Sequence, residues 1–376
     1  MSMGRWIFAA VLVVVGSAFG QGGGIQGTPA AIPSQGNAVL ATKPGAVRVG
    51  IGDVAPAIGL NSWVKGTPVN EYAKGRVYVV EFWAMGVAAC GKSGPLLGEL
   101  QTVFKDKGLT VVGVSVMERG GVEEVERYVK GVGERLTQAI GYDATGDAAR
   151  RFMQPTGQNA IPVVFVIDRD GRLAWIGHPL DGLDRVVERV VAGNWDLAKA
   201  KQEADRRAAA ENKSGPLVTR LEEEFGANQS DKALATMDEL AAVDPPVSGE
   251  WIVSKFGYLL LERKDADKAY AYAAVALAGV GKDDAPSLKA MAWMTLAEPG
   301  VARRDVVLAG KMAARADEIT GHADANVLDT LARAMFDSGD VAGAIEVQKR
   351  AAEGCVLPSQ RREMEGRVQR YGAGKK

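Results

Sequence analysis

The chain has 376 residues, of which 47% are hydrophobic, 24% charged and 6% aromatic, so it has the composition of a folded protein with about two domains and not of a disordered chain. Its 45 basic and 46 acidic side chains leave a formal charge of −1, which gives no general attraction to nucleic acid. The two cysteines and two histidines form no zinc-ligand spacing, so we expect neither a metal nor a cofactor, and a disulfide-rich scaffold is excluded.

The first 20 residues predict an export signal. Arg5 precedes an uninterrupted apolar run over residues 6–15, and the small residues Ala18 and Gly20 stand at the −3 and −1 positions before Gln21. The apolar run is shorter than a membrane span of about 20 residues, so we expect cleavage, with an uncleaved N-terminal membrane tether as the alternative. Residues 21–45, rich in Gly, Ala, Pro and Gln, predict a low-complexity tether. We therefore expect an exported protein of the periplasm or cell envelope.

Residues 46–195 predict an α/β domain, because near-continuous apolar runs alternate with helical spacing. The first run, VYVVEFW, encloses a single carboxylate, Glu81. The order of elements predicts a mixed sheet with helices on both faces. In chain order we expect a strand at 77–83, a turn at 86–94, a helix to Phe104, a strand at 109–117, a helix at 122–132, strands at 161–168 and 173–177, and a helix at 183–193.

Three separated motifs in this region resemble the thioredoxin-like redoxins of the TlpA type. They are VVEFWA, CGKSGPLLGELQ and GQNAIPVVFVIDRDGRLAWIGHP, in that order along the chain. The resemblance covers residues 46–195 and implies a thioredoxin-like fold. It also implies an exported thiol–disulfide oxidoreductase, whose active site in the family is a Cys-x-x-Cys at the start of a helix.

The sequence departs from the family at the first of these cysteines. Val87 stands where the family has its nucleophilic cysteine, and Cys90 matches only the second, resolving cysteine. Dithiol exchange needs one thiolate to attack the substrate disulfide and a second thiol to release the mixed disulfide. Because valine has no thiol, the full dithiol cycle is not available by the family's route.

The resemblance implies that a remnant of the redox site is kept. Cys90 is expected in the first turn of a helix, where the helix dipole and free N–H groups favour a thiolate. Glu81 matches the buried carboxylate that exchanges a proton with the resolving cysteine, and Pro162 matches the cis-proline beside the active site. Cys90 as an inert, small apolar residue is the alternative.

Two other redox interpretations fit less well. A peroxiredoxin-like site would need the motif Pro-x-x-x-Thr-x-x-Cys ending at Cys90. Position 83, where the motif has Pro, is Trp, and position 87, where it has Thr, is Val. His178 follows the strand at 173–177, and we expect it to be a hydrogen-bonded loop histidine and not a catalytic base.

The rest of the chain predicts helices only. Residues 196–214 indicate an exposed helical connector that breaks at 212–216, and residues 215–372 a helical repeat domain. Four alanines recur in similar helical contexts at separations of 36, 40 and 35 residues, and the region resembles tetratricopeptide repeats, with an insertion at the longest separation. The alanines are Ala233, Ala269, Ala309 and Ala344.

These patterns lead to one main hypothesis and two alternatives. The main one is an exported thioredoxin-fold protein with a degenerate site, which binds a protein or peptide partner through its helical repeats. For the repeats alone, the alternative is a helical bundle that binds no such partner. The first alternative is a monothiol thiol–disulfide oxidoreductase that uses Cys90. In the second, Cys90 and Cys355 form a structural disulfide in an oxidising compartment.

Overall fold

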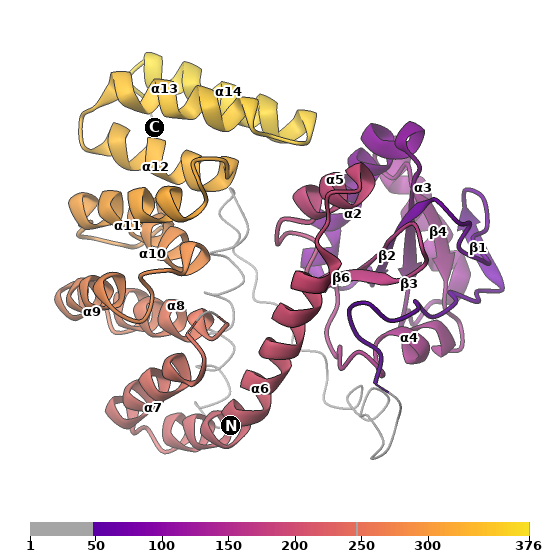
Figure 1. Ribbon diagram of the computed structural model, residues 1–376, viewed down its shortest axis with the longest axis horizontal. Helices are drawn as coiled ribbons and strands as arrows, with labels where there is room; N and C mark the ends of the chain where they lie inside the picture. Colours follow the sequence, from indigo (N-terminus) through magenta and orange to yellow (C-terminus); the bar gives the residue numbers. More distant parts are fainter. Residues whose placement is uncertain (1–47, 246, 376) are drawn as a thin grey trace. The chain divides into compact units, whose positions relative to one another are not determined.

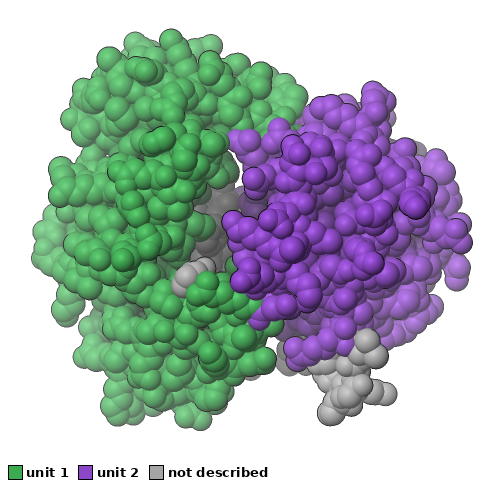
Figure 2. Space-filling model, in the orientation of Figure 1, with its two compact units in different colours: residues 1–26, 206–376 green, residues 27–205 purple. Residues whose placement is uncertain are grey.

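The computed structural model describes residues 48–245 and 247–375, so the predicted export signal (1–20) and the predicted tether (21–45) lie outside the described residues. The described chain divides into an N-terminal unit and a C-terminal unit at the bond between Asp205 and Arg206, which falls inside the predicted connector (Figure 2). Among the described residues, none of the helices combines the length and the apolar character that crossing a membrane requires.

A six-stranded mixed sheet forms the centre of the N-terminal unit, in the order β1-β4-β3-β2-β5-β6 (Figure 1). β2 is parallel to β3, and β3 is parallel to β4. β5 and β6 extend the sheet beyond β2 as antiparallel strands, and β1 is antiparallel to β4. The strands are β1 (Ser62–Lys65), β2 (Val77–Trp83), β3 (Leu109–Ser115), β4 (Ala139–Tyr142), β5 (Val163–Ile167) and β6 (Leu173–Gly177).

Helices cover this sheet on both faces, because successive side chains of a strand point to opposite sides. Tyr78, Val80 and Phe82 of β2 join an apolar cluster that includes α4. Trp83 lies in a second cluster, with Cys90 of α2 and residues of α3. The helices are α2 (Ala88–Phe104), α3 (Gly121–Val132), α4 (Asp147–Phe152) and α5 (Leu183–Ala192), with single 3₁₀ turns at Lys105–Lys107 and Gly133–Arg135.

The predicted mixed sheet with helices on both faces is confirmed, and an all-helical region follows it as expected. The second predicted strand is two residues too long: β3 ends at Ser115, and Met117 has a left-handed backbone with φ of 59°. β1, β4 and α4 have no counterpart among the predicted elements. They have four, four and six residues, which is too short for a hydrophobic period to stand out.

The C-terminal unit consists of helices that stack in two rows. α8 packs on α10 and α10 on α12, although these helices are not consecutive, and α9 packs on α11. Figure 1 shows α7, α9, α11 and α13 in order along this unit. The helices are α7 (Ser230–Val243), α8 (Gly249–Gly257) with a π turn at Tyr258–Glu262, α9 (Ala266–Ala278), α10 (Ala285–Ala297), α11 (Val306–Ile319), α12 (Ala325–Asp337), α13 (Val341–Glu353) and α14 (Pro358–Gly372).

The four alanines of the predicted repeat occupy equivalent places in this stack. Ala233, Ala269, Ala309 and Ala344 are each the fourth residue of α7, α9, α11 and α13, and each is fully buried. Three of these helices also begin in the same way, with an aspartate whose carboxylate accepts a backbone N–H of the first turn; these residues are Asp265, Asp305 and Asp340. Small side chains at these points let neighbouring helices approach closely.

The insertion expected from the 40-residue separation lies between α10 and α11. That connection has eight residues, 298–305, whereas α12 and α13 are joined by only three, 338–340. Arg304 closes the longer connection, because its guanidinium donates to the carbonyl oxygens of Thr295 (2.6 Å) and Glu298 (2.7 Å).

The predicted break at 212–216 is wrong, because α6 (Leu197–Gly226) runs continuously through Pro216. A proline inside a helix lacks the N–H that would bond to the carbonyl four residues earlier. The turns after Pro216 nevertheless place Leu217, Leu221 and Phe225 against α7 in a buried cluster. Burial of this apolar stripe outweighs the lost hydrogen bond.

Candidate functional site

The candidate site lies at the carboxyl edge of the parallel strands β2 and β3. After Trp83 the chain turns through residues 84–87, and α2 begins at Ala88, so the turn predicted for 86–94 is wrong beyond Val87. Val87 is the half-buried N-cap residue of α2, and its side chain has no polar atom to accept a helix N–H. Cys90 is the third residue of the helix, so its predicted place in the first helical turn agrees with the structure.

Pro162 reaches the same edge of the sheet. The Ile161–Pro162 peptide bond is cis, as the resemblance implied, and it directly precedes β5. β5 runs antiparallel to β2 with Val163 opposite Phe82, so the cis-proline lies beside the end of β2. The fold therefore brings the turn before α2 and the loop before β5 to one edge.

Glu81 lies below this edge as a buried acid. Its side chain is 2% exposed, and Ser93 of α2, itself fully buried, holds its carboxyl oxygen Oε1 in a short hydrogen bond. The same Ser93 Oγ lies 3.1 Å from the carbonyl oxygen of Cys90. Glu81, Ser93 and the Cys90 backbone thus form one connected group.

Counting protons in this group favours a neutral Glu81. A serine hydroxyl has one proton, so it cannot donate to both the Glu81 carboxyl and the Cys90 carbonyl. When Glu81 is protonated, its O–H donates to Ser93 Oγ, and Ser93 donates to Cys90. Burial acts in the same direction: desolvation raises the pKa of Glu81 to about 8, although the hydrogen bond from Ser93 lowers it.

Replacing Ser93 tests this hydrogen-bonded group. We expect Ser93→Ala to raise the pKa of Glu81 further, because the hydroxyl that stabilises the ionised carboxylate is lost while the burial remains. The pKa is measured by NMR titration of the labelled Glu81 side-chain carboxyl. Ser115→Ala is the matched control, since Ser115 is also fully buried but donates to Glu118 (3.0 Å). Equal pKa values in the two variants would refute the assignment.

Cys90 does not have the thiolate character that its helical position suggested. Its side chain is 4% exposed and packs with Trp83 and with Val125 and Val129 of α3. Desolvation raises the pKa of the Cys90 thiol to about 12, and the nearby carboxylates of Glu81 and Glu118 also raise it. The expected stabilisation of a thiolate by the helix terminus is therefore outweighed by burial.

Glu118 is a site residue that was not predicted from the sequence. It follows β3, and its Oε1 accepts the backbone N–H of Met85 (2.8 Å) and the hydroxyl of Ser115 (3.0 Å). Because Met85 belongs to the turn before α2, Glu118 fixes that turn. Ser93 lies within the motif CGKSGPLLGELQ but was given no role, and Glu118 lies in none of the three motifs, so only their contacts reveal them.

The remaining singled-out residues lie outside this group. His178 behaves as predicted for a loop histidine: its Nδ1 accepts the backbone N–H of Leu180 (3.3 Å), and desolvation lowers its pKa. Cys355 is buried in a separate cluster of the C-terminal unit, where its thiol donates to the carbonyl of Ala351 (3.3 Å). Each cysteine is thus a thiol packed within the core of its own unit.

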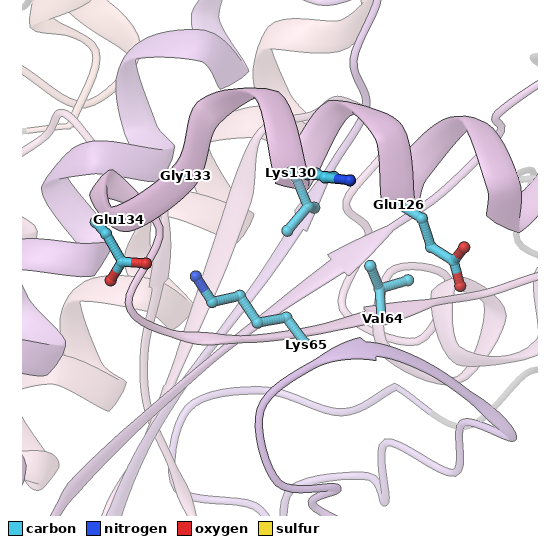
Figure 3. Close-up of a pocket in the computed structure, with 7 residues that line it drawn as sticks. Val64, Lys65, Glu126, Lys130, Gly133 and Glu134 are labelled. Atoms are coloured by element: carbon cyan, nitrogen blue, oxygen red, sulfur yellow. The ribbon is translucent and has the colours of Figure 1, made fainter.

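Two depressions on the surface offer no better site. One lies between β1 and α3, and Figure 3 shows the charged ends of Lys65, Lys130, Glu126 and Glu134 around it. The other lies in the C-terminal unit beside the turn between α9 and α10, around Val280 and Lys282. The part of the chain that the structure describes holds no cluster of three or more side chains suited to binding a metal ion.

Comparison with known proteins agrees with the fold. Residues 51–176 match the AhpC/TSA family. Protein FixW of Rhizobium leguminosarum is 29% identical over 178 residues, which are 46% of this chain and 76% of FixW. Thiol-disulfide oxidoreductase ResA of Bacillus anthracis is 26% identical over 100 residues, which are 27% of this chain and 53% of ResA.

Solved structures similar to this chain include a thiol:disulfide interchange protein from Bacteroides sp., which is 28% identical and has a TM-score of 0.33. That likeness covers 39% of this chain and 92% of the other. A thioredoxin family protein from Chlorobium tepidum is 26% identical over 39% of this chain and 98% of its own, with a TM-score of 0.32. The match to the AhpC/TSA family confirms the redoxin resemblance, and the mixed sheet with helices on both faces confirms the predicted fold class of the N-terminal unit. The TlpA type and the tetratricopeptide type of the repeats stay predictions.

Proposed function

We propose that this chain is an exported redoxin-fold protein that does not carry out dithiol exchange and acts as a binding or scaffold protein of the cell envelope. The observation that carries the proposal is the arrangement at the start of α2. Val87 occupies the half-buried position before the helix, and Cys90 is a 4% exposed thiol in an apolar cluster. A substrate disulfide therefore meets no thiol at the position where the family has its nucleophile.

The monothiol alternative asks Cys90 itself to attack a disulfide. The attacking species is the thiolate, and burial raises the pKa of the Cys90 thiol well above its ordinary value, so very little of it is ionised at neutral pH. The thiol is also covered by Trp83 and α3. Both features oppose the monothiol reaction, so we place binding ahead of catalysis.

The helical unit supplies the partner-binding part of the proposal. Its helices stack in two rows with alanines and capping aspartates at equivalent places. Stacked helix pairs build an extended surface that holds peptide or protein segments in repeat proteins of this kind. We therefore propose a protein or peptide ligand here, and no nucleic acid.

The cellular location rests on the sequence of residues 1–20, with its short apolar run and small residues before Gln21. FixW and ResA are similar to this chain, and ResA carries the name thiol-disulfide oxidoreductase. We propose export to the periplasm or cell envelope, with the membrane tether as the form expected if the N-terminal segment is not cleaved.

Restoring the missing cysteine tests the proposal. In Val87→Cys, the introduced thiolate attacks a substrate disulfide and one substrate thiol is released. Cys90 then attacks the introduced sulfur within the same molecule, a step that needs far less thiolate than attack on a free disulfide, and the second substrate thiol leaves as the disulfide between positions 87 and 90 forms. We expect reductase activity in an insulin or small-disulfide assay with dithiothreitol, and none in the unmodified protein. Val87→Ser is the control, because its hydroxyl cannot form a disulfide. A folded Val87→Cys protein without activity would contradict the assignment of position 87, and activity in the unmodified protein would contradict the proposed function.

A further inference from the structure

The helices that carry the four repeat alanines, α7, α9, α11 and α13, can be compared with one another at the positions that face outward. Counted from the first residue of each helix, positions 6, 9, 10 and 13 are exposed or half-exposed in α7, α9, α11 and α13. In α7, α11 and α13 these positions hold two, three and four charged residues. They are Asp238 and Glu239 in α7, Lys311, Arg315 and Glu318 in α11, and Glu346, Lys349, Arg350 and Glu353 in α13.

α9 carries no charge at any of these positions. They hold Ala271, Ala274, Val275 and Ala278, which we call the α9 face. Val275 is 70% exposed, and Val280, just beyond the helix, is 36% exposed. No charged residue occurs between Lys268 and Lys282. A helix face without charge, in a row where the equivalent faces carry two to four charged residues, is a candidate contact with another molecule.

We propose that the α9 face is a self-association surface, which packs against the α9 face of a second copy of this chain. A two-fold interface presents the same patch from both subunits, so the patch must be complementary to itself. An uncharged face meets this condition because it brings no like charges together. Its short side chains also let two helices approach closely.

The charges on the flanking helices select the orientation of the two copies. α7 is acidic at its outward positions, through Asp238 and Glu239, whereas α11 is mainly basic, through Lys311 and Arg315. A two-fold axis parallel to α9 places α7 of one copy opposite α11 of the other, so that opposite charges meet. An axis perpendicular to α9 would place α7 against α7, and the acidic side chains would repel.

These flanking side chains keep enough exposure to act across an interface. Asp238 pairs with Lys255, and Glu239 contacts Arg220, yet Asp238 and Glu239 remain about half exposed. Arg315 pairs with Asp283 and Glu318 and also stays partly exposed. One helix face is smaller than the roughly 800 Å² per subunit of a stable interface, so the flanking helices are required as well. Val307 of α11, 67% exposed, adds apolar surface there.

Sedimentation equilibrium on the purified full chain tests the proposal. We expect the wild type to dimerise and Val275→Asp to weaken the dimer by about 100-fold or more, because the two aspartates face each other across the axis. Ala342→Asp, which places the same charge on the exposed part of α13, is the matched control and should leave the dimer unchanged. All three proteins carry the same N-terminal segment, so that segment cannot account for a difference. Circular dichroism and thermal unfolding verify that Val275→Asp is folded.

Cysteine cross-linking tests the orientation in the same proteins. With parallel helices, each position of the α9 face meets its own equivalent, so Ala271→Cys and Ala278→Cys each form a disulfide-linked dimer alone. With antiparallel helices, cross-links form only when the two variants are mixed. A monomeric wild type, a dimer insensitive to Val275→Asp, or binding of the α9 face to phospholipid vesicles by a monomeric chain would each overturn the proposal.

Discussion

Glu81→Gln is expected to make the protein markedly more stable than the wild type at alkaline pH, but not at acidic pH. Glu81 is buried on the α2 side of β2, where desolvation raises its pKa to about 8 from its ordinary value of 4.5. A glutamine at this position has no charge to bury, and its amide can still donate a hydrogen bond to Ser93. The difference between the two proteins is therefore a function of pH.

The sign follows from comparing the folded and unfolded states. Below pH 4.5 the carboxyl is neutral in both states, so it makes no pH-dependent contribution. Between pH 4.5 and about 8 the unfolded chain ionises Glu81 while the folded chain keeps it neutral, so the wild type loses stability as the pH rises. Each unit of pKa difference is worth about 1.4 kcal/mol, so the loss levels off above pH 8 at a value on the order of a few kcal/mol.

Urea unfolding of the two proteins at a series of pH values measures this difference. Glu126→Gln, which removes a carboxylate from the exposed side of α3, is the control for a general effect of charge. A constant difference between Glu81→Gln and wild type from pH 4 to pH 9 would show that Glu81 is not a buried acid with a raised pKa.

Arg367→Ala is expected to destabilise the C-terminal unit strongly. The carboxylate of Asp329 in α12 is fully buried and forms an ion pair with Arg367 of α14. Gln348 of α13 donates to the other carboxylate oxygen of Asp329 (2.8 Å), so three helices meet at this group. Removing the guanidinium leaves the buried carboxylate without its cation, which costs about 3 to 5 kcal/mol.

Denaturant unfolding and hydrogen exchange of α14 measure this effect. Arg362→Ala, on an exposed position of the same helix, should change stability by less than about 0.5 kcal/mol. Replacing both partners with apolar residues, Asp329→Leu with Arg367→Met, should recover much of the loss, because neither charge of the buried pair then remains. If Arg367→Ala cost no more than Arg362→Ala, the ion pair would not hold α14 in place.

Much of the fold was predictable because its main elements are long and apolar. β2 and the strand pair β5–β6 stand out as runs of apolar residues, and the four repeat alanines gave the period of the helical unit. The continuity of α6 was not predictable from local signals. Pro216 indicates a break, and only the burial of Leu221 and Phe225 against α7 explains why the helix continues.

The site was predictable in position but not in chemistry. The resemblance placed Glu81, Cys90 and Pro162 together. In the structure Cys90 and Pro162 lie at the carboxyl edge of β2, and Glu81 lies buried below that edge. The thiolate character expected for Cys90 was wrong, because the packing of α3 on Trp83 desolvates the thiol, and such packing between distant segments leaves no local signal. Ser93 and Glu118 escaped notice for the same reason.

Cys90 is a buried thiol that takes no part in turnover, and the pH dependence of its alkylation tests this most directly. The native protein is treated with iodoacetamide from pH 6 to pH 10. Peptide mass analysis without reduction then measures the alkylation of Cys90 and Cys355 and any disulfide between them. Disulfide reductase activity is assayed for the wild type and for Cys90→Ser. We expect both thiols to be unlinked and slow to react until the protein unfolds, with no activity in either protein. Rapid alkylation of Cys90 near neutral pH, together with reductase activity that Cys90→Ser abolishes, would contradict the account.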